Sequence, residues 1–327
     1  MRQRGRTPGP AAAGALASAL VVGAFGRHCL IETEDGRRLI AHPRGKKSQA
    51  VVGDRVLWQA TGDEASIERL QDRRNLFYRQ DEIRTKSFAA NLDRVLILIA
   101  AEPEFSESQL SRALVAAEAE GITPVIALNK SDLAEPFARA WQRLAPYRAM
   151  AYAVLPLALS PRGDAPVDDG LPALLAALRG HHTLVLGPSG SGKSTLINRL
   201  VPEAQAETGE ISQALNSGKH TTTSTRWYWV AALDGAQQRG ALIDSPGFQE
   251  FGLHHIEPTR LADCMPDLRQ YLGQCKFYNC THLHEPGCAV LAQVVEEGPQ
   301  EPGVGRITER RHRIYAQLFE ELGRQRW

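Results

Sequence analysis

The sequence lacks the run of about 18 apolar residues that a helix needs to cross a membrane, so we expect no membrane-spanning segment and no membrane partner. It also lacks an excess of charge of one sign. Its 38 Lys and Arg residues face 37 Asp and Glu residues, and the formal net charge is +1. No overall field therefore selects a partner. The 327 residues are enough for two or three domains.

Positive charge gathers at the two ends of the chain. Residues 1–50 contain nine Lys or Arg and three Asp or Glu, and residues 303–327 contain six Arg and three Glu. Basic ends on a neutral body suggest an anionic partner such as RNA, although solvated charge alone gives the same composition. Residues 1–18 are mainly Arg, Pro, Gly and Ala and are predicted to form a disordered basic tail.

Short strand-like segments follow, up to about residue 80. Three of them cover residues 19–22, 29–31 and 38–41, and turns that contain glycine separate them. Short strands at this spacing are typical of a small barrel, so we predict an N-terminal, five-stranded OB-type β-barrel over residues 19–80. An SH3-like or other small β domain is the alternative.

The pattern changes from Asn91 onward, where continuous apolar runs alternate with helical stretches. The runs cover residues 94–100, 123–128, 182–186 and 240–243 and are typical of strands buried on both faces. Their alternation with helices indicates a parallel, doubly wound α/β sheet over residues 85–258.

A phosphate-binding loop follows the third of these runs and precedes a helix-forming stretch. It consists of Gly187, Pro188, Ser189, Gly190, Ser191, Gly192, Lys193, Ser194 and Thr195. The glycines let backbone N–H groups point at phosphate oxygens, and the next helix adds the positive end of its dipole. Lys193 is expected to reach the β- and γ-phosphates of a nucleotide, and Ser194 to bind Mg²⁺.

The tetrapeptide Asn129, Lys130, Ser131 and Asp132 follows another buried strand and predicts which base is bound. The Asp132 carboxylate can accept hydrogen bonds from N1–H and N2–H₂ of guanine, whereas adenine would leave it unpaired. Lys130 is expected over the face of the ring. Such a tetrapeptide alone is often a surface turn, but beside a phosphate-binding loop it indicates GTP.

Two further segments are expected to contact Mg²⁺ and the γ-phosphate. In Asp244-Ser245-Pro246-Gly247, Asp244 can hold Mg²⁺ through water and the Gly247 N–H can contact the γ-phosphate. Residues 218–223 lie between this motif and the phosphate-binding loop, and either Thr222 or Thr223 can close over the ion. A plain polar loop is the alternative for residues 218–223.

The residue after Gly247 is Phe248, which cannot orient a water as the glutamine of small GTPases does at this position. Gln249 lies one residue too late. The catalytic group must therefore come from elsewhere, and His220 is the candidate, with a structural role in its loop as the alternative. Intrinsic hydrolysis is expected to be slow until a partner completes the site.

Three of the five cysteines crowd into one short segment with two histidines. Cys275, Cys280, His282 and Cys288 offer three thiolates and an imidazole, so we predict one structural Zn²⁺ in a closed tetrahedral site. The site would hold together a mostly helical C-terminal domain over residues 259–327. His284 is the rival ligand.

The order of the motifs is unusual, because the guanine motif precedes the phosphate-binding loop. Circular permutation explains this order and keeps the sheet, since buried strands set the core and connections can be moved. The segment after Gly247 then leads directly into the C-terminal domain. Nucleotide state can therefore act on that domain with little intervening structure.

In combination, these motifs resemble those of the bacterial ribosome small-subunit-dependent GTPase family, RsgA or YjeQ. The resemblance extends from about Ala19 over nearly the whole chain and also rests on residues 53–56, 91–93 and 218–223. It implies an OB-fold, a circularly permuted GTPase core and a zinc domain. It also implies late maturation of the small ribosomal subunit, with GTP hydrolysis stimulated by that subunit. Residues 157–160 give no clean match to the family's base-contacting Ser-Ala element.

We therefore predict a GTP hydrolase that uses Mg²⁺ and one Zn²⁺ and binds the small ribosomal subunit and its rRNA through the barrel and the basic ends. A GTPase switch acting on a non-ribosomal protein partner is the alternative. The chain is expected to be a monomer. It is also expected to be cytoplasmic, since a nucleotide switch needs cytosolic GTP, although its N-terminus imitates a signal peptide.

Overall fold

The computed structural model describes residues 16–26, 28–44, 50–62, 64–82, 84–160, 169–202, 204, 225–245, 251–296 and 305–324. Its N-terminal part contains the strands β1 (Ala17–Phe25), β2 (His28–Thr33), β3 (Arg38–Pro43), β4 (Arg55–Thr61) and β5 (Glu64–Leu70). Strand β1 pairs with β2 and β4, and β3 pairs with β2 and β5, so the pairing closes on itself through β4 and β5. The predicted five-stranded barrel is confirmed. Val21, Ile31 and Val56 lie in its core.

The central part is an α/β unit. Its strands are β8 (Arg94–Ala100), β9 (Thr123–Asn129), β10 (Ala153–Pro156), β11 (His182–Leu186), β12 (Arg226–Trp229) and β13 (Ala241–Asp244). Its helices are α1 (Glu107–Ala119), α2 (Ala134–Arg143), α3 (Ala145–Ala149), α4 (Leu171–Leu178) and α5 (Lys193–Leu200), with a short 3-10 turn, η1 (Ala231–Leu233). Strands β10, β9, β8, β11 and β13 lie in this order and run parallel, and β12 is antiparallel beside β13. The predicted parallel sheet is confirmed.

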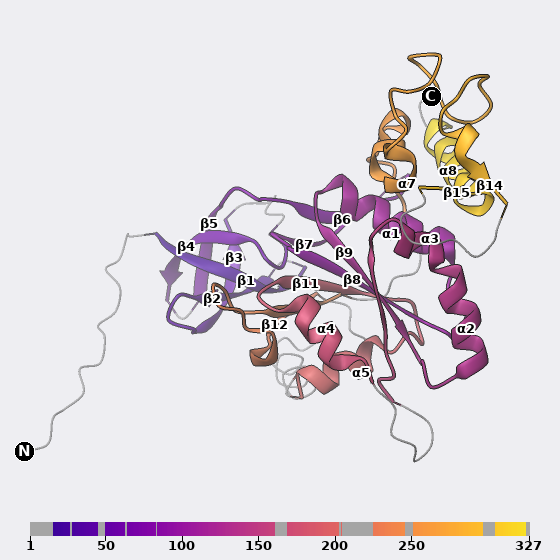
Figure 1. Ribbon diagram of the computed structural model, residues 1–327. Coiled ribbons are helices and arrows are strands. Elements are labelled where there is room, and N and C mark those ends of the chain that lie inside the picture. Colours follow the sequence, from indigo (N-terminus) through magenta and orange to yellow (C-terminus); the bar gives the residue numbers. More distant parts are fainter. Residues whose placement is uncertain are drawn as a thin grey trace, which may run out of the picture.

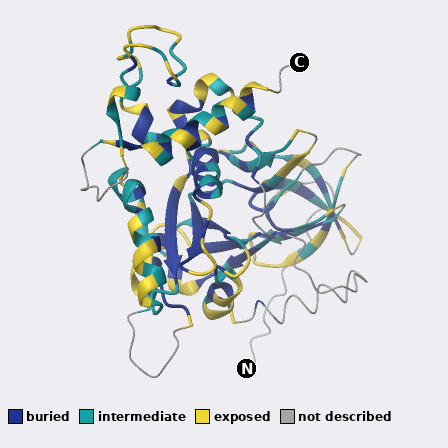
Figure 2. Ribbon diagram, turned by 90° about the vertical axis from the view of Figure 1, so that its right-hand side faces the viewer, coloured by how far each residue is buried: buried dark blue, intermediate teal, exposed yellow. Residues whose placement is uncertain are grey.

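Helices cover both faces of this sheet (Figures 1 and 2). On β8, Val95, Ile97 and Ile99 pack on the side of α1 and α3, while Leu96 and Leu98 pack on the side of α4 and α5. All five side chains are buried. Burial on both faces explains why this strand is a continuous apolar run in the sequence.

The barrel and the α/β unit share one continuous 11-stranded sheet, because β12 pairs with β13 on one side and with β1 of the barrel on the other (Figure 1). Along the chain they are connected by a hairpin of β6 (Leu76–Gln80) and β7 (Thr85–Ala90). After the hairpin, the side chain of Asn91 donates to the carbonyl of Gly53 over 2.9 Å. These contacts hold the barrel against the edge of the α/β unit.

The C-terminal part packs on the α1 side of the α/β unit. It contains η2 (Pro258–Arg260), η3 (Ala262–Cys264), α7 (Pro266–Arg269), η4 (Leu291–Gln293), α8 (Glu309–Gly323) and a two-stranded sheet of β14 (Val294–Val295) and β15 (Ile307–Thr308). Arg311 of α8 is buried and donates to both oxygens of Asp267 over 2.8 and 3.0 Å and to Ser111 of α1 over 2.8 Å. A buried charge needs such partners, so this contact fixes α8 on the α/β unit.

The part of the chain that the structure describes contains no helix with the length and apolarity needed to cross a membrane.

Candidate functional site

The predicted phosphate-binding loop connects β11 to α5. Gly192 precedes the helix with a φ of 100°, and Gly190 has a φ of 80°, conformations that glycine adopts readily. A Cβ atom on Gly192 would lie 2.3 Å from the side-chain nitrogen of Asn129. Glycine is therefore needed at this position for both the path and the packing of the loop. Helix α5 begins at Lys193, so its first N–H groups have no partner within the helix and are available to an anion.

The guanine motif and the phosphate-binding loop lie against each other. Asn129 ends β9 and is buried; its side-chain nitrogen donates to the Ser191 carbonyl over 2.9 Å, and its oxygen accepts from the Leu159 N–H over 3.1 Å. The Ser131 N–H donates to the Leu157 carbonyl over 2.9 Å. The two motifs therefore meet at the carboxyl ends of parallel strands, where open α/β sheets bind ligands.

Lys130 and Asp132 follow directly at this junction. Lys130 has a φ of 68°, and its ammonium donates to the Glu102 carbonyl just after β8. Asp132 is partly exposed. Residues 157–160, which give no clean match to the expected base-contacting element, are placed beside the guanine motif by the bonds of Leu157 and Leu159. This loop is thus in position to contribute a second contact to a base.

Lys193 and Asp244 form the polar centre of the site. The Lys193 ammonium donates to Asp244 Oδ1 over 2.5 Å and to the Ser245 carbonyl over 3.0 Å. The two side chains are only 16% and 13% exposed, so the pair is largely shielded from solvent. Ser194 and Thr195 follow on the exposed start of α5. A paired ammonium and carboxylate, with a hydroxyl on the next residue of the helix, fit a nucleotide phosphate and a hard cation such as Mg²⁺, which prefers oxygen ligands.

Four predicted site residues, His220, Thr222, Thr223 and Gly247, lie outside the described residues. The described chain resumes at Thr225, directly before β12. This described segment ends at Ser245. The Ser245 hydroxyl donates to the Val185 carbonyl over 3.3 Å. Arg226 and Asp244 are opposite each other in the β12–β13 pair. The described residue pair Arg226 and Asp244 therefore connects the strand that follows residues 218–223 to the first residue of the Asp244-Ser245-Pro246-Gly247 motif.

The described segment that follows the Asp244-Ser245-Pro246-Gly247 motif and begins at Phe251 pairs with the hairpin. Leu253 forms a bridge with Gln80 of β6. The ring of Phe251 packs against those of Phe77 and Phe88, with centroid distances of 5.5 and 6.0 Å. This segment is therefore part of the core between the barrel and the α/β unit.

Arg112 of α1 connects the same segment to the C-terminal helix α8, and no motif in the sequence indicates this contact. Its guanidinium donates to the Phe251 carbonyl over 3.3 Å and to Glu321 of α8 over 2.9 Å. The hydrogen bonds from Arg112 lower the pKa of Glu321. His254 Nε2 lies 3.8 Å from Glu321. These four residues line a cavity of about 750 Å³ beside the hairpin.

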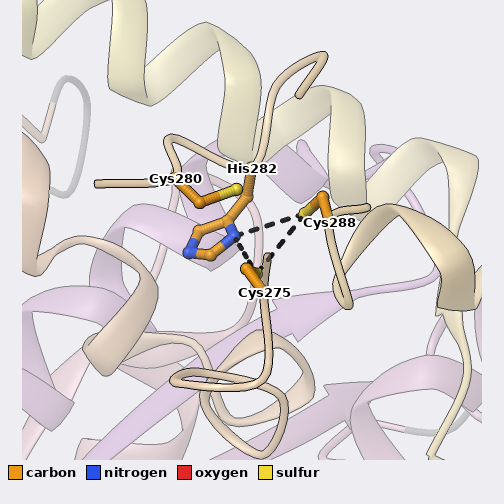
Figure 3. Close-up of side chains that lie close together, drawn as sticks. All are labelled: Cys275, Cys280, His282 and Cys288. Carbon is orange, nitrogen blue, oxygen red and sulfur yellow. Dashed lines mark hydrogen bonds between the residues drawn. The ribbon is translucent and has the colours of Figure 1, made fainter. Parts of the chain in front are cut away.

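The predicted metal ligands come together in the C-terminal part (Figure 3). The ligand atoms of Cys275, Cys280, His282 and Cys288, here called the Cys3His cluster, all lie within 4.8 Å of one another. The sulfurs of Cys275 and Cys288 are 3.8 Å apart, and His282 Nδ1 is 3.5 and 3.4 Å from them. Two sulfurs bound at about 2.3 Å to one tetrahedral ion would be about 3.8 Å apart, so the spacing fits Zn²⁺. His284, the rival ligand, is exposed and outside the cluster.

Helix α8 supports the Cys3His cluster from one side. The Tyr315 hydroxyl donates to the Thr281 carbonyl over 2.8 Å, and His312 Nε2 lies 2.8 Å from the His282 carbonyl. Burial lowers the pKa of His282, which favours the neutral imidazole that a metal requires. The cluster is therefore fastened to the helix that Arg112 and Arg311 hold on the α/β unit.

The fold and the site define a P-loop GTPase whose motifs are circularly permuted. A family model described as RsgA GTPase matches residues 70–254. The small ribosomal subunit biogenesis GTPase RsgA of Variovorax paradoxus (strain S110) is 65% identical over 100% of both chains. The protein of the same name from Paraburkholderia xenovorans (strain LB400) is 50% identical over 93% of each chain. The chain belongs to the RsgA GTPase family and is a GTP hydrolase.

Two solved structures have a similar fold. The crystal structure of YjeQ from Thermotoga maritima matches with a TM-score of 0.68 and 26% identity, over 94% of this chain and 99% of that one. The structure of YloQ, described as a circularly permuted GTPase, matches with a TM-score of 0.67 and 23% identity over 98% of this chain and 99% of that one, which bears on the fold alone. The permuted GTPase fold predicted from the motif order is confirmed.

Proposed function

We propose that the chain hydrolyses GTP to GDP and phosphate as a late-stage maturation factor of the small ribosomal subunit, in the cytoplasm and as a monomer, and that the subunit stimulates the reaction. The hydrogen bond from Asn129 to Ser191 carries the nucleotide-binding part, because it joins the guanine motif and the phosphate-binding loop into one site. The ribosomal part is supported by relatives that match at least 93% of both chains and are named small ribosomal subunit biogenesis GTPases.

In this proposal the backbone N–H groups of residues 187–195 bind the phosphates. Lys193 moves from Asp244 to the β- and γ-phosphates, where its charge offsets the negative charge that develops during attack by water. Asp132 accepts hydrogen bonds from guanine, and Lys130 lies over the ring. Asn129 acts by bracing, since its side chain is engaged with backbone groups of both loops.

Ser194, Asp244 and one of Thr222 and Thr223 would hold Mg²⁺, which neutralises phosphate charge when bound. The Gly247 N–H would contact the γ-phosphate and report its presence. The Cys3His cluster would hold one structural Zn²⁺, because four protein ligands leave no position for a substrate.

We assign residues 1–18 to a basic tail, 19–80 to an OB-type domain, 85–258 to the GTPase domain and 259–327 to the zinc domain. Strand β6 lies in the second of these ranges but pairs with β7 in the third, so the hairpin connects the two domains. The barrel and the basic ends would contact rRNA, a role for which OB-folds are suited.

The two segments expected to contact the γ-phosphate, residues 218–223 and 244–247, are here called the first and second switch segments. Along the chain, each leads to a different flanking domain, which suggests how nucleotide state reaches those domains. The first ends next to β12, which pairs with β1 of the barrel. The second is followed by Phe251. The guanidinium of Arg112 donates both to the carbonyl of Phe251 and to Glu321 of α8. Rearrangement of both segments on loss of the γ-phosphate would shift the barrel and the zinc domain and release the subunit.

Purified small subunits are expected to accelerate GTP hydrolysis by about 10- to 100-fold, less than the roughly thousandfold or greater effect of an arginine finger supplied by a partner. Hydrolysis is measured with and without subunits across a salt series. Stimulation should decline steeply between about 50 and 200 mM salt, because RNA contacts release counterions. Large subunits are the matched control. Equal rates with small subunits, large subunits and buffer would favour a non-ribosomal partner.

Asp132→Asn is expected to weaken GTP binding by about 10- to 100-fold, because hydrogen bonds to a charged group are lost. It should also shift the base preference from guanine towards xanthine, and so towards xanthosine triphosphate. Competition binding with the guanine, xanthine and adenine nucleotides measures both effects. Asp263→Asn makes the same change on an exposed carboxylate of the C-terminal part and should behave as wild type. An unaltered base preference in Asp132→Asn would remove this residue from the base-binding role.

His220→Ala is expected to slow subunit-stimulated hydrolysis by about 100-fold. This is the lower end of the rate loss that follows removal of a side chain that transfers a proton. The affinity for GTP should stay the same. Single-turnover hydrolysis on saturating subunits measures the chemical step, and a fluorescent GTP analogue measures binding. If the stimulated rates of variant and wild type are equal, His220 has no catalytic role.

A further inference from the structure

The loop between the first two ligands of the Cys3His cluster carries two exposed aromatic side chains. Tyr278 has a relative exposure of 103%, and Phe277 beside it is 42% exposed. Large exposed apolar side chains are few among the described residues, and these two are the only ones adjacent in sequence. The nucleotide site does not use them, and the loops of this region stand out from the body of the molecule at the top of Figure 1. Two neighbouring exposed aromatic side chains offer a partner a small apolar surface.

The loop is short and fixed at its base. Four residues separate Cys275 from Cys280. The Lys276 N–H donates to the Gly287 carbonyl over 3.0 Å. A Cβ atom added to Gly287 would lie 3.0 Å from the Cβ of Lys276, so the loop that contains Lys276 is in close contact with the residue before Cys288. A loop held in this way presents Tyr278 with little freedom to lose, which lowers the entropic cost of binding.

The charge around the aromatic pair is suited to an anionic partner. The Lys276 ammonium lies 5.5 Å from the centre of the Phe277 ring. The segment from the first to the last ligand of the cluster contains one acidic side chain, Glu285. Its carboxylate is turned to the backbone and accepts from the N–H groups of Thr281 and Leu283 over 2.9 and 3.2 Å. A cation therefore lies beside the Phe277 ring, and the carboxylate of Glu285 already accepts hydrogen bonds from the backbone.

We propose that Tyr278, with Phe277 and Lys276, forms a stacking platform for an unpaired base of RNA. The proposal rests on the proposed function, which supplies the RNA of the small subunit as the partner. Aromatic rings stack on unpaired bases of any sequence, and a neighbouring lysine contacts the phosphate. A ring on a projecting loop is open on both faces, whereas the aromatic anchors of protein interfaces fill enclosed pockets. RNA is therefore the favoured partner.

The first test measures binding of the full-length, zinc-loaded protein to purified small subunits. Tyr278→Ala and Tyr278→Leu are each expected to weaken binding about 10-fold, within the range for loss of one stacked base, while Tyr278→Trp retains it. Leucine keeps apolar area but has no π face. Affinity retained by Tyr278→Leu and lost by Tyr278→Ala would indicate docking on a protein and overturn the proposal, as would wild-type affinity in Tyr278→Ala. Zinc content and intrinsic GTP hydrolysis of each variant verify that the fold is intact.

The second test needs no ribosome and so separates this proposal from the proposed function. The emission of Tyr278→Trp minus that of wild type is followed during titration with a single-stranded RNA and with the same RNA annealed to its complement. Quenching by the single strand alone is expected, because paired bases are not available for stacking. No quenching, or equal quenching by the duplex, would overturn the platform. Quenching by the single strand, in a protein that neither binds small subunits nor is stimulated by them, would instead overturn the ribosomal function and leave the platform standing.

Discussion

Lys193→Ala is expected to reduce GTP hydrolysis by about a thousandfold or more, the scale on which a cation stabilises the charge of this transition state. Binding of GTP should weaken by about 10- to 100-fold, since a charged hydrogen-bond donor to the phosphates is lost. The expectation follows from the position of the ammonium, which reaches Asp244 and the Ser245 carbonyl at the end of β13. Calorimetric titration with GTP and single-turnover hydrolysis measure the two effects.

Lys86→Ala is the matched control for this variant. Lys86 is exposed on β7 of the hairpin, and its ammonium lies 5.5 Å from the Phe88 ring. Its loss removes the same charge from outside every predicted nucleotide-binding segment. It should bind and hydrolyse GTP as wild type does. If Lys193→Ala also kept wild-type affinity and rate, the phosphate-binding assignment of residues 187–195 would be wrong.

The phosphate-binding loop could be predicted because its requirements are local. Gly190 and Gly192 adopt positive φ within one short segment, and a strand and a helix flank it directly. The buried strands could also be predicted, because burial on both faces requires a continuous apolar run such as that of β8. The short strands of the barrel and the Cys3His cluster also follow from spacing along the chain.

The contacts between domains could not be predicted in this way, because their partners are far apart in sequence and follow no period. Arg112 and Glu321 are separated by 209 residues, and Ser111 and Arg311 by 200. Neither arginine differs in its sequence context from a solvated one on a helix. The pairing of β12 with the barrel is of the same kind, since nothing in a four-residue strand specifies which edge it joins.

Asn129 shows a further limit of motif reasoning. The tetrapeptide indicates that the residue belongs to the nucleotide site, and the structure places it there. Its side chain, however, is 4% exposed and bonds to the Ser191 carbonyl and the Leu159 N–H. A motif conveys which residue types occur together, whereas the division between contact and support depends on partners that only the fold brings near.

Removal of zinc is expected to unfold the loops of the Cys3His cluster and to abolish subunit stimulation, while GTP binding stays within about twofold of wild type. Structural zinc contributes about 10–16 kcal/mol to the folding of small peptides. These loops have few buried apolar side chains of their own to replace it. The buried contact of Arg311 with Asp267 and Ser111 lies outside the cluster, so α8 should remain docked. Native mass spectrometry before and after chelation should show one zinc per chain and then none, and hydrogen exchange should rise in residues 275–291.

Two substitutions separate the ligand set from its surroundings. Cys288→Ser removes one of the proposed ligands and should reproduce the effect of the chelator, because three ligands cannot close a structural tetrahedral site. His284→Ala changes an exposed histidine outside the cluster and should retain zinc, protection and stimulation. Loss of zinc from His284→Ala would show that His284, and not His282, is the histidine ligand. A wild-type chain that binds no zinc would show that the spacing of the cluster reflects packing alone.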